Sequence, residues 1–125
     1  MGALNKVILL GELTRDPELR TTNGGTSVGM FGLAMERRYT SGEEQRHETT
    51  FVDVTVYGRT AEAVAQYMRK GSTILVEGRL HLDQWVTKDN PPQQRSKLIV
   101  IGENIKFVGG GDAERHEEKE RGGRW

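Results

Sequence analysis

Aromatic side chains in the segment Phe51–Tyr57 stand where a buried core would not place them. Apolar and polar residues alternate here, so an extended chain puts three valines on one face and both aromatic residues on the other. Trp85 has the same parity as the polar residues of its own segment. Rings packed in a core or an interface are one explanation of such residues. Rings that stack on nucleobases, each of which offers a π-face, are the other.

Other chemistries find no support in the sequence. It contains no cysteine, which excludes disulfides, thiolate metal sites and cysteine nucleophiles. His47, His81 and His116 are scattered without the spacing of metal ligands. No glycine run is followed by the Gly-Lys-Ser/Thr of a phosphate loop. We therefore expect no enzymatic activity, no metal and no cofactor.

Charge is balanced overall, with 18 basic and 18 acidic residues, so any polyanion must be held by a local stripe of cations. A single Lys or Arg is most often solvated surface. As a group, however, the basic residues in or beside the aromatic segments are candidates for phosphate contacts: Lys6, Arg37, Arg38, Arg46, Arg59, Arg69, Lys70, Arg79 and Lys88. The short apolar run Val7–Leu10 cannot span a membrane, and we expect a cytoplasmic, nucleoid-associated protein.

Five segments carry the hydrophobic patterns and turn signals of strands. One helix is predicted between the third and the fourth, with Thr60 as N-cap, Gly71 as C′ residue and an apolar stripe at positions 61, 64, 65 and 68. The polar segment Arg37–Glu48 is expected to be a flexible hairpin loop. The five predicted strands are Leu4–Leu13, Val28–Met35, Phe51–Tyr57, Thr73–Leu82 and Lys97–Val108.

This order of elements predicts an all-β fold, the five-stranded Greek-key barrel of the OB-fold with one helix between strands 3 and 4. A ferredoxin-like fold would need a second helix, and a sandwich about seven strands. The barrel domain should cover residues 1–108. Residues 109–125 contain almost no apolar residue before Trp125 and are expected to form a short flexible charged tail.

Several motifs in this order resemble those of the bacterial and mitochondrial single-stranded-DNA-binding proteins, over residues 3–108. They are Asn5-Lys6-Val7-Ile8-Leu9-Leu10-Gly11, Arg15-Asp16-Pro17-Glu18-Leu19-Arg20, Leu33-Ala34 with Phe51 and Val56-Tyr57-Gly58-Arg59, Tyr67-Met68-Arg69-Lys70-Gly71-Ser72 and Val76-Glu77-Gly78-Arg79-Leu80. The resemblance implies a homotetramer that binds and protects single-stranded DNA in replication, recombination and repair. It also implies base stacking on Tyr39, Phe51, Tyr57 and Trp85. The family usually has tryptophan at the first, second and fourth of these positions.

Two departures from the family pattern change what we expect. Asp53, between Phe51 and Tyr57, and Asp83-Gln84, before Trp85, stand where members often have basic residues, which predicts weaker electrostatic attachment and a shallower salt dependence. Members also normally end in an acidic tip on which partner enzymes dock, whereas the printed sequence ends in Arg-Gly-Gly-Arg-Trp. We therefore do not expect recruitment of replication or repair proteins through such a tip. A degenerate tip, a tail-less paralogue, a mobile-element version and a shortened chain all remain open.

Two other functions are compatible with the predicted fold. One is a dimeric accessory protein similar to primosomal replication protein N, acting mainly through protein contacts. The other is an OB module that binds oligosaccharide or protein only. Aromatic residues at all four stacking positions favour binding of single-stranded DNA over the first of these. The second is distinguished by the response of Trp85 fluorescence to oligo-dT.

Overall fold

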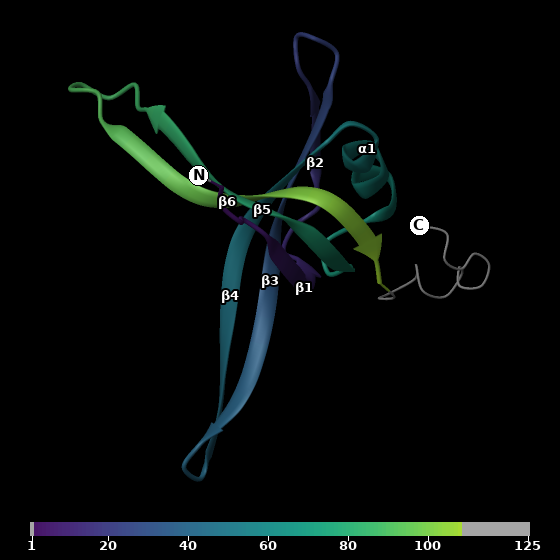
Figure 1. Ribbon diagram of the computed structural model, residues 1–125, viewed down its shortest axis with the longest axis vertical. Helices are drawn as coiled ribbons and strands as arrows, with labels where there is room; N and C mark the ends of the chain where they lie inside the picture. The colour runs from purple at the N-terminus through teal and green to yellow at the C-terminus, as the bar shows by residue number, and fades with distance from the viewer. Residues whose placement is uncertain (1, 109–125) are drawn as a thin grey trace.

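The computed structural model describes residues 2–108, which form a β-barrel with two long hairpin arms and one helix (Figure 1). The expected tail, residues 109–125, lies outside the described residues. The strands are β1 (Val7–Leu13), β2 (Glu18–Thr21), β3 (Ser27–Ser41), β4 (Glu44–Tyr57), β5 (Thr73–Val86) and β6 (Gln94–Phe107), with helix α1 (Gly58–Tyr67) between β4 and β5.

The sheet closes on itself, as the OB-fold prediction requires. The strands follow the order β1-β5-β6-β4-β3-β2, and a further pairing of β1 with β3 completes a ring of five strands. Among the strands of the described residues, only β4 and β6 run parallel. The predicted fold is thus confirmed, with α1 after the third barrel strand. The short strand β2 was not expected, because all four of its side chains are exposed and it carries no burial pattern.

The core is built from residues that alternate along the strands. Val54 and Val56 are fully buried and Val52 packs against the cluster, which confirms the inward face predicted for this segment. Phe31 and Leu33 of the paired strand β3 are buried beside them. The predicted stripe of α1 also reaches this core, through its buried members at positions 61, 64 and 68.

The barrel closes at a glycine. A Cβ atom on Gly11 would overlap the carbonyl oxygen of Ala34. The lack of a side chain lets β1 approach β3 closely, and the two strands pair only at the next two residues, Glu12 and Leu13. On the N-terminal side of Glu12, β1 remains paired with β5 but not with β3.

The expectation of a flexible loop over Arg37–Glu48 is wrong. Strands β3 and β4 stay paired as far as Ser41 and Glu44 and turn through Gly42, whose φ of 66° suits a tight hairpin. Likewise, β5 and β6 stay paired as far as Val86 and Gln94. Both arms project from the barrel (Figure 1), so their two faces meet solvent and no hydrophobic alternation marks them as strands.

The predicted ends of the helix are also wrong. Tyr57 occupies the N-cap position with no side-chain hydrogen bond, and the helix begins at Gly58, so Thr60 lies within its first turn. Met68 is the C-cap, which places Arg69 and Gly71 beyond the helix. Arg69 nevertheless serves the helix end, because its Nη1 donates hydrogen bonds to the carbonyl oxygens of Ala65 and Met68 at 2.8 and 2.7 Å.

Candidate functional site

Strand register brings the aromatic residues of two distant segments onto one surface. Phe51 and Tyr57 project from β4 on the side away from the core and are 69% and 48% exposed. Thr55 lies between them on β4 and projects from the same face. It pairs with Ile101 of β6, and Ile101 pairs with Arg79 of β5. Directly paired residues project from the same face of a sheet. The side chains of β3–β6 that point away from the core therefore form one continuous surface, which we call the outer face.

Trp85 belongs to the same outer face. It lies three strand steps of two residues beyond Arg79 on β5, pairs with Arg95 of β6, and is 44% exposed. Next to this pair, Asp83 stands opposite Lys97. Three aromatic rings thus share a surface with cations, although β4 and β5 are separated by β6.

Tyr39 is not brought to this face. It pairs with Arg46 on the β3–β4 arm and alternates with Arg38, which pairs with His47. Its parity is that of the core residue Leu33, so it occupies the opposite side of the ribbon from Phe51. Arg37 lies over the Tyr39 ring, 5.0 Å from Cζ to the ring centroid.

Asp53, the acidic residue between the rings, is held by two cations. Its Oδ2 accepts a hydrogen bond from Nζ of Lys97 on β6, and its Oδ1 lies 3.9 Å from Nη1 of Arg15. Arg15 follows β1 and reaches this place by lying over Gly32 of β3, which pairs with Asp53. A side chain at position 32 would collide with the Arg15 guanidinium.

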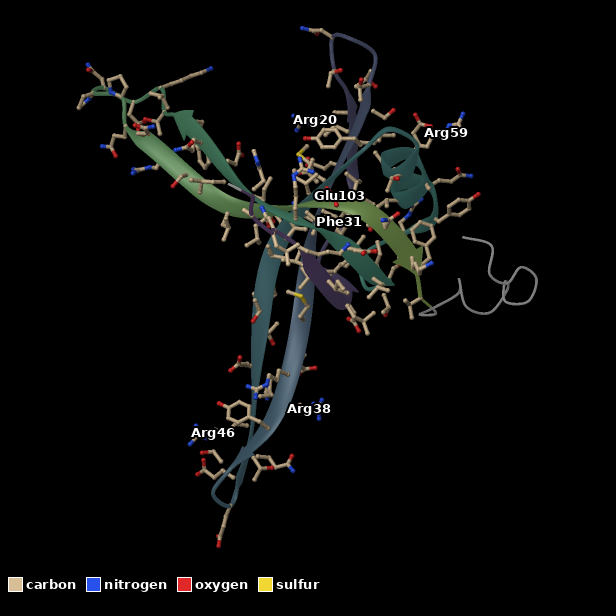
Figure 2. The ribbon with its side chains drawn as sticks, in the orientation of Figure 1. Arg20, Phe31, Arg38, Arg46, Arg59 and Glu103 are labelled. Carbon is tan, nitrogen blue, oxygen red and sulfur yellow. The ribbon has the colours of Figure 1, made fainter. Side chains whose placement is uncertain are left out.

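The basic residues singled out from the sequence do not gather in one patch. Arg38 and Arg46 lie far out on the β3–β4 arm, whereas Arg59 lies at α1 (Figure 2). Several are paired with carboxylates: Lys6 with Glu77 at 2.5 Å, Arg38 with Glu36 at 3.9 Å, Arg46 with Glu44 at 2.7 Å and Arg79 with Glu103 at 2.8 Å. Among residues 2–108, the other five candidates form no ion pair: Arg37, Arg59, Arg69, Lys70 and Lys88.

Lys6 shows how such pairing lowers the charge available to a ligand. The Glu77 carboxylate accepts a hydrogen bond from Lys6 and attracts its charge, and both effects raise the pKa of Lys6 above its ordinary value. Lys6 therefore stays charged at neutral pH. Its charge is largely matched by that of Glu77, so a phosphate would have to compete with this carboxylate.

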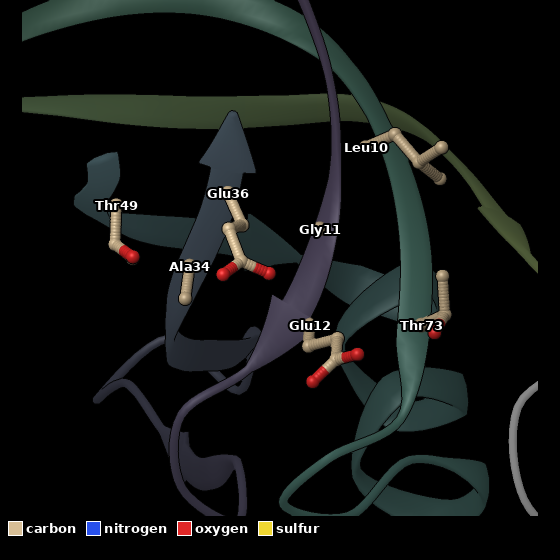
Figure 3. Close-up of a pocket in the computed structure, with 7 residues that line it drawn as sticks. All are labelled: Leu10, Gly11, Glu12, Ala34, Glu36, Thr49 and Thr73. Atoms are coloured by element: carbon tan, nitrogen blue, oxygen red, sulfur yellow. The ribbon is translucent and has the colours of Figure 1, made fainter. Parts of the chain in front are cut away.

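A hollow of about 410 Å³ borders the outer face where β1 and β3 separate (Figure 3). Its lining includes Glu12, Glu36 and Ala34, the residue paired with Phe51, but no basic residue. Glu36 is paired with Arg38 at 3.9 Å, whereas Glu12 forms no ion pair among residues 2–108, and a hollow whose charged lining residues are carboxylates alone disfavours a phosphate. A polyanion that meets Phe51 is therefore directed toward β6 and β5 rather than toward β1.

Three cations near the rings were missed from sequence: Arg15, Arg95 and Lys97. For Lys97 the sequence does indicate which face of its strand it occupies, because it lies two residues before Ile99 in an apolar strand. Its position beside Asp53 depends on the pairing of β4 with β6, which no local pattern reveals. Arg15 comes from a third segment, beyond the end of β1.

Within residues 2–108, no three His, Asp or Glu side chains gather in a way that could hold a metal ion. The helix in that part of the chain is too short to cross a membrane.

Comparison with known proteins adds a family to this geometry. Residues 4–108 match the model of the single-strand binding protein family. The single-stranded DNA-binding proteins of Wolinella succinogenes and Helicobacter hepaticus are 47% and 43% identical over 105 residues, which is 83% of this chain but 64% and 61% of theirs. The chain therefore spans less than two thirds of the length of these relatives. Among solved structures, the Plasmodium falciparum SSB in complex with ssDNA superposes with a TM-score of 0.78 at 26% identity, covering 86% of this chain and 97% of that one.

Proposed function

Because this chain belongs to the single-strand binding protein family, we propose that it binds single-stranded DNA without sequence preference and without catalysing a reaction. Bases would stack on Phe51, Tyr57 and Trp85, and cations around them would contact phosphates. The protein would protect single strands during replication, recombination and repair, in the cytoplasm at the nucleoid.

The observation that carries this proposal is the position of the three rings. They lie on one outer face, Phe51 more than half exposed and Tyr57 and Trp85 slightly less than half, although the core of the barrel is filled by aliphatic residues and Phe31. Exposed aromatic rings on a surface that also carries charged side chains such as Arg79 and Lys97 are suited to a planar ligand with an apolar face. Stacking does not depend on the base, so binding would tolerate any sequence.

Phosphate contacts come second in this proposal. The candidates from the sequence on the arms, Arg37, Arg38, Arg46 and Lys88, would follow a strand that extends beyond the barrel, with Tyr39 as an outlying stacking position. Arg79 and Lys6 would have to exchange a carboxylate for a phosphate. Arg59, Arg69 and Lys70 lie at α1 and would contact DNA only if it wraps around that end.

Quenching of Trp85 fluorescence by oligo-dT tests the proposal. The chain has two tryptophans, so the measurement uses a Trp125→Phe variant in which Trp85 is the only one. Because a stacked base quenches an indole, we expect emission to fall in a saturable manner on addition of oligo-dT, and not on addition of duplex DNA of the same length. Unchanged emission at concentrations that saturate binding by another probe would contradict stacking at Trp85.

We further propose the homotetramer that the family resemblance implies. Strand β1 pairs with β5 along Val7–Glu12, while its other edge is paired with β3 only at Glu12 and Leu13. Ile8 and Leu10 are exposed beside that open edge. An open edge with apolar side chains favours pairing with another strand, and a second copy of β1 offers the same surface.

Charged residues at this edge should break the assembly. A mass four times that of the 14.0-kDa chain is expected in solution for the unaltered protein, and a smaller species for the double variant Ile8→Glu, Leu10→Glu. Multi-angle light scattering measures both. A dimer of the unaltered chain would instead favour the accessory protein similar to primosomal replication protein N. The relatives in Wolinella succinogenes and Helicobacter hepaticus are named single-stranded DNA-binding proteins, which favours binding of single-stranded DNA over the accessory role.

A further inference from the structure

Asp53, Lys97 and Arg15 together form a charged cluster at the centre of the outer face. They come from β4, from β6 and from the bend after β1. Lys97 donates to one carboxylate oxygen of Asp53, and Arg15 lies near the other. All three side chains are partly exposed, between 37% and 54%. The cluster therefore faces solvent and can be reached by a ligand that lies on Phe51.

Within the cluster itself positive charge exceeds negative charge, and Asp83, which stands opposite Lys97 on β5, forms no ion pair with Lys97. Two cations share one carboxylate, and 3.9 Å from Arg15 to Asp53 is too long for a hydrogen bond, so the Arg15 donors remain available. An arginine guanidinium presents paired donors that fit a phosphate, and the Lys97 ammonium has three donors, one of which is directed at Asp53.

The position of Arg15 depends on the backbone beneath it. Gly32 leaves open the space that the guanidinium occupies, which lets a residue from beyond β1 reach across β3 to Asp53 of β4. Asp53 in turn fixes both cations within the surface that holds Phe51 and Tyr57. An anion that bridges Lys97 and Arg15 would lie directly beside the rings.

We propose that Lys97 and Arg15 form a phosphate-binding site on the outer face, and that Asp53 limits its strength by competing with the phosphate for both cations. The ligand is a backbone phosphate of single-stranded DNA, so this inference rests on the proposed function and adds to it two contacts and a counter-charge. Asp53 is thus part of the site. Where members of the family often have a basic residue at position 53, this chain would use cations from β6 and from the bend after β1 instead.

The test is the affinity of the full chain for labelled oligo-dT, measured by fluorescence anisotropy over a series of salt concentrations. Lys97→Gln and Arg15→Gln should each weaken binding several-fold and lower the slope of log affinity against log salt by about 0.7, the value for one phosphate contact to a single strand. Asp53→Asn should tighten binding by about two- to fivefold, the range for release of an exposed ion pair, and steepen the slope. The matched controls are Lys106→Gln, on the same strand as Lys97, and Arg20→Gln on β2; neither should alter the slope.

Each outcome distinguishes this inference from the proposed function. If the unaltered chain does not bind oligo-dT, the proposed function fails and the site with it. If that chain binds and Phe51→Ala weakens it, but Lys97→Gln and Arg15→Gln behave as the controls do, only the phosphate site is wrong. Weaker binding by Asp53→Asn than by the unaltered chain would also overturn it, because Asp53 would then support binding rather than compete. Circular dichroism of each variant checks that the barrel is folded.

Discussion

Phe51→Ala should weaken the binding of oligo-dT by about one to two orders of magnitude while leaving the fold intact. Stacking of a base on an aromatic side chain contributes about 1–3 kcal/mol, a magnitude established for this class of protein, and removal of the ring loses that contribution. The Phe51 ring is the most exposed of the three on the outer face, so its removal opens no cavity. Anisotropy of a labelled oligo-dT at one fixed salt concentration measures the change.

Two further variants test whether this loss is due to stacking on Phe51. Phe51→Trp should bind at least as tightly as the unaltered chain, because a larger ring at the same position offers more stacking area. Tyr39→Ala should have a smaller effect than Phe51→Ala, because Tyr39 projects from the other side of the β3–β4 ribbon. Binding by Phe51→Ala within twofold of the unaltered chain would contradict a stacking role for the outer face.

Phe31→Ala should lower the free energy of unfolding by about 3–5 kcal/mol, the cost of removing a large aromatic ring from a filled core. Phe31 is 0% exposed and lies among the core residues of β3 and β4 (Figure 2). Urea denaturation at a fixed protein concentration measures the loss, since assembly of copies also contributes to stability.

Phe51→Ala is the matched control, because it makes the same chemical change on the opposite face of the same sheet. It should change the free energy of unfolding by less than about 1 kcal/mol, as exposed substitutions usually do. The two variants should therefore separate binding from stability, one losing the first and the other the second. A loss below about 1 kcal/mol for Phe31→Ala would mean that the core is not packed around this ring.

The barrel could be predicted from the sequence because burial of one face leaves a regular spacing of apolar residues, two in a strand and three to four in a helix. The valines of β4 and the stripe of α1 face one core, and each pattern is local to its segment. The outer ends of β3–β6 were missed because an arm that meets solvent on both faces has no such period. Backbone pairing stabilises the arms, and hydropathy does not report it.

The candidate site divides in the same way. Phe51, Tyr57 and Trp85 follow from local alternation, and the structure places them on one face. Register between strands is not local, so the sequence did not show that Lys97 and Arg15 lie at Asp53. Nor did it show that Tyr39 and Phe51 occupy opposite sides of a ribbon, because the segment between them was expected to be a loop.

Photochemical cross-linking tests most directly that bases lie on the outer face. An oligo-dT containing 5-iodouracil, bound to the full chain and irradiated, forms covalent bonds to aromatic side chains in contact with its bases, and mass spectrometry of the peptides identifies them. The outer face predicts cross-links at Phe51, Tyr57 and Trp85, abolished at position 51 by Phe51→Ala. Cross-links confined to Tyr67 of α1, or to Tyr39 on the other side of the arm, would contradict it.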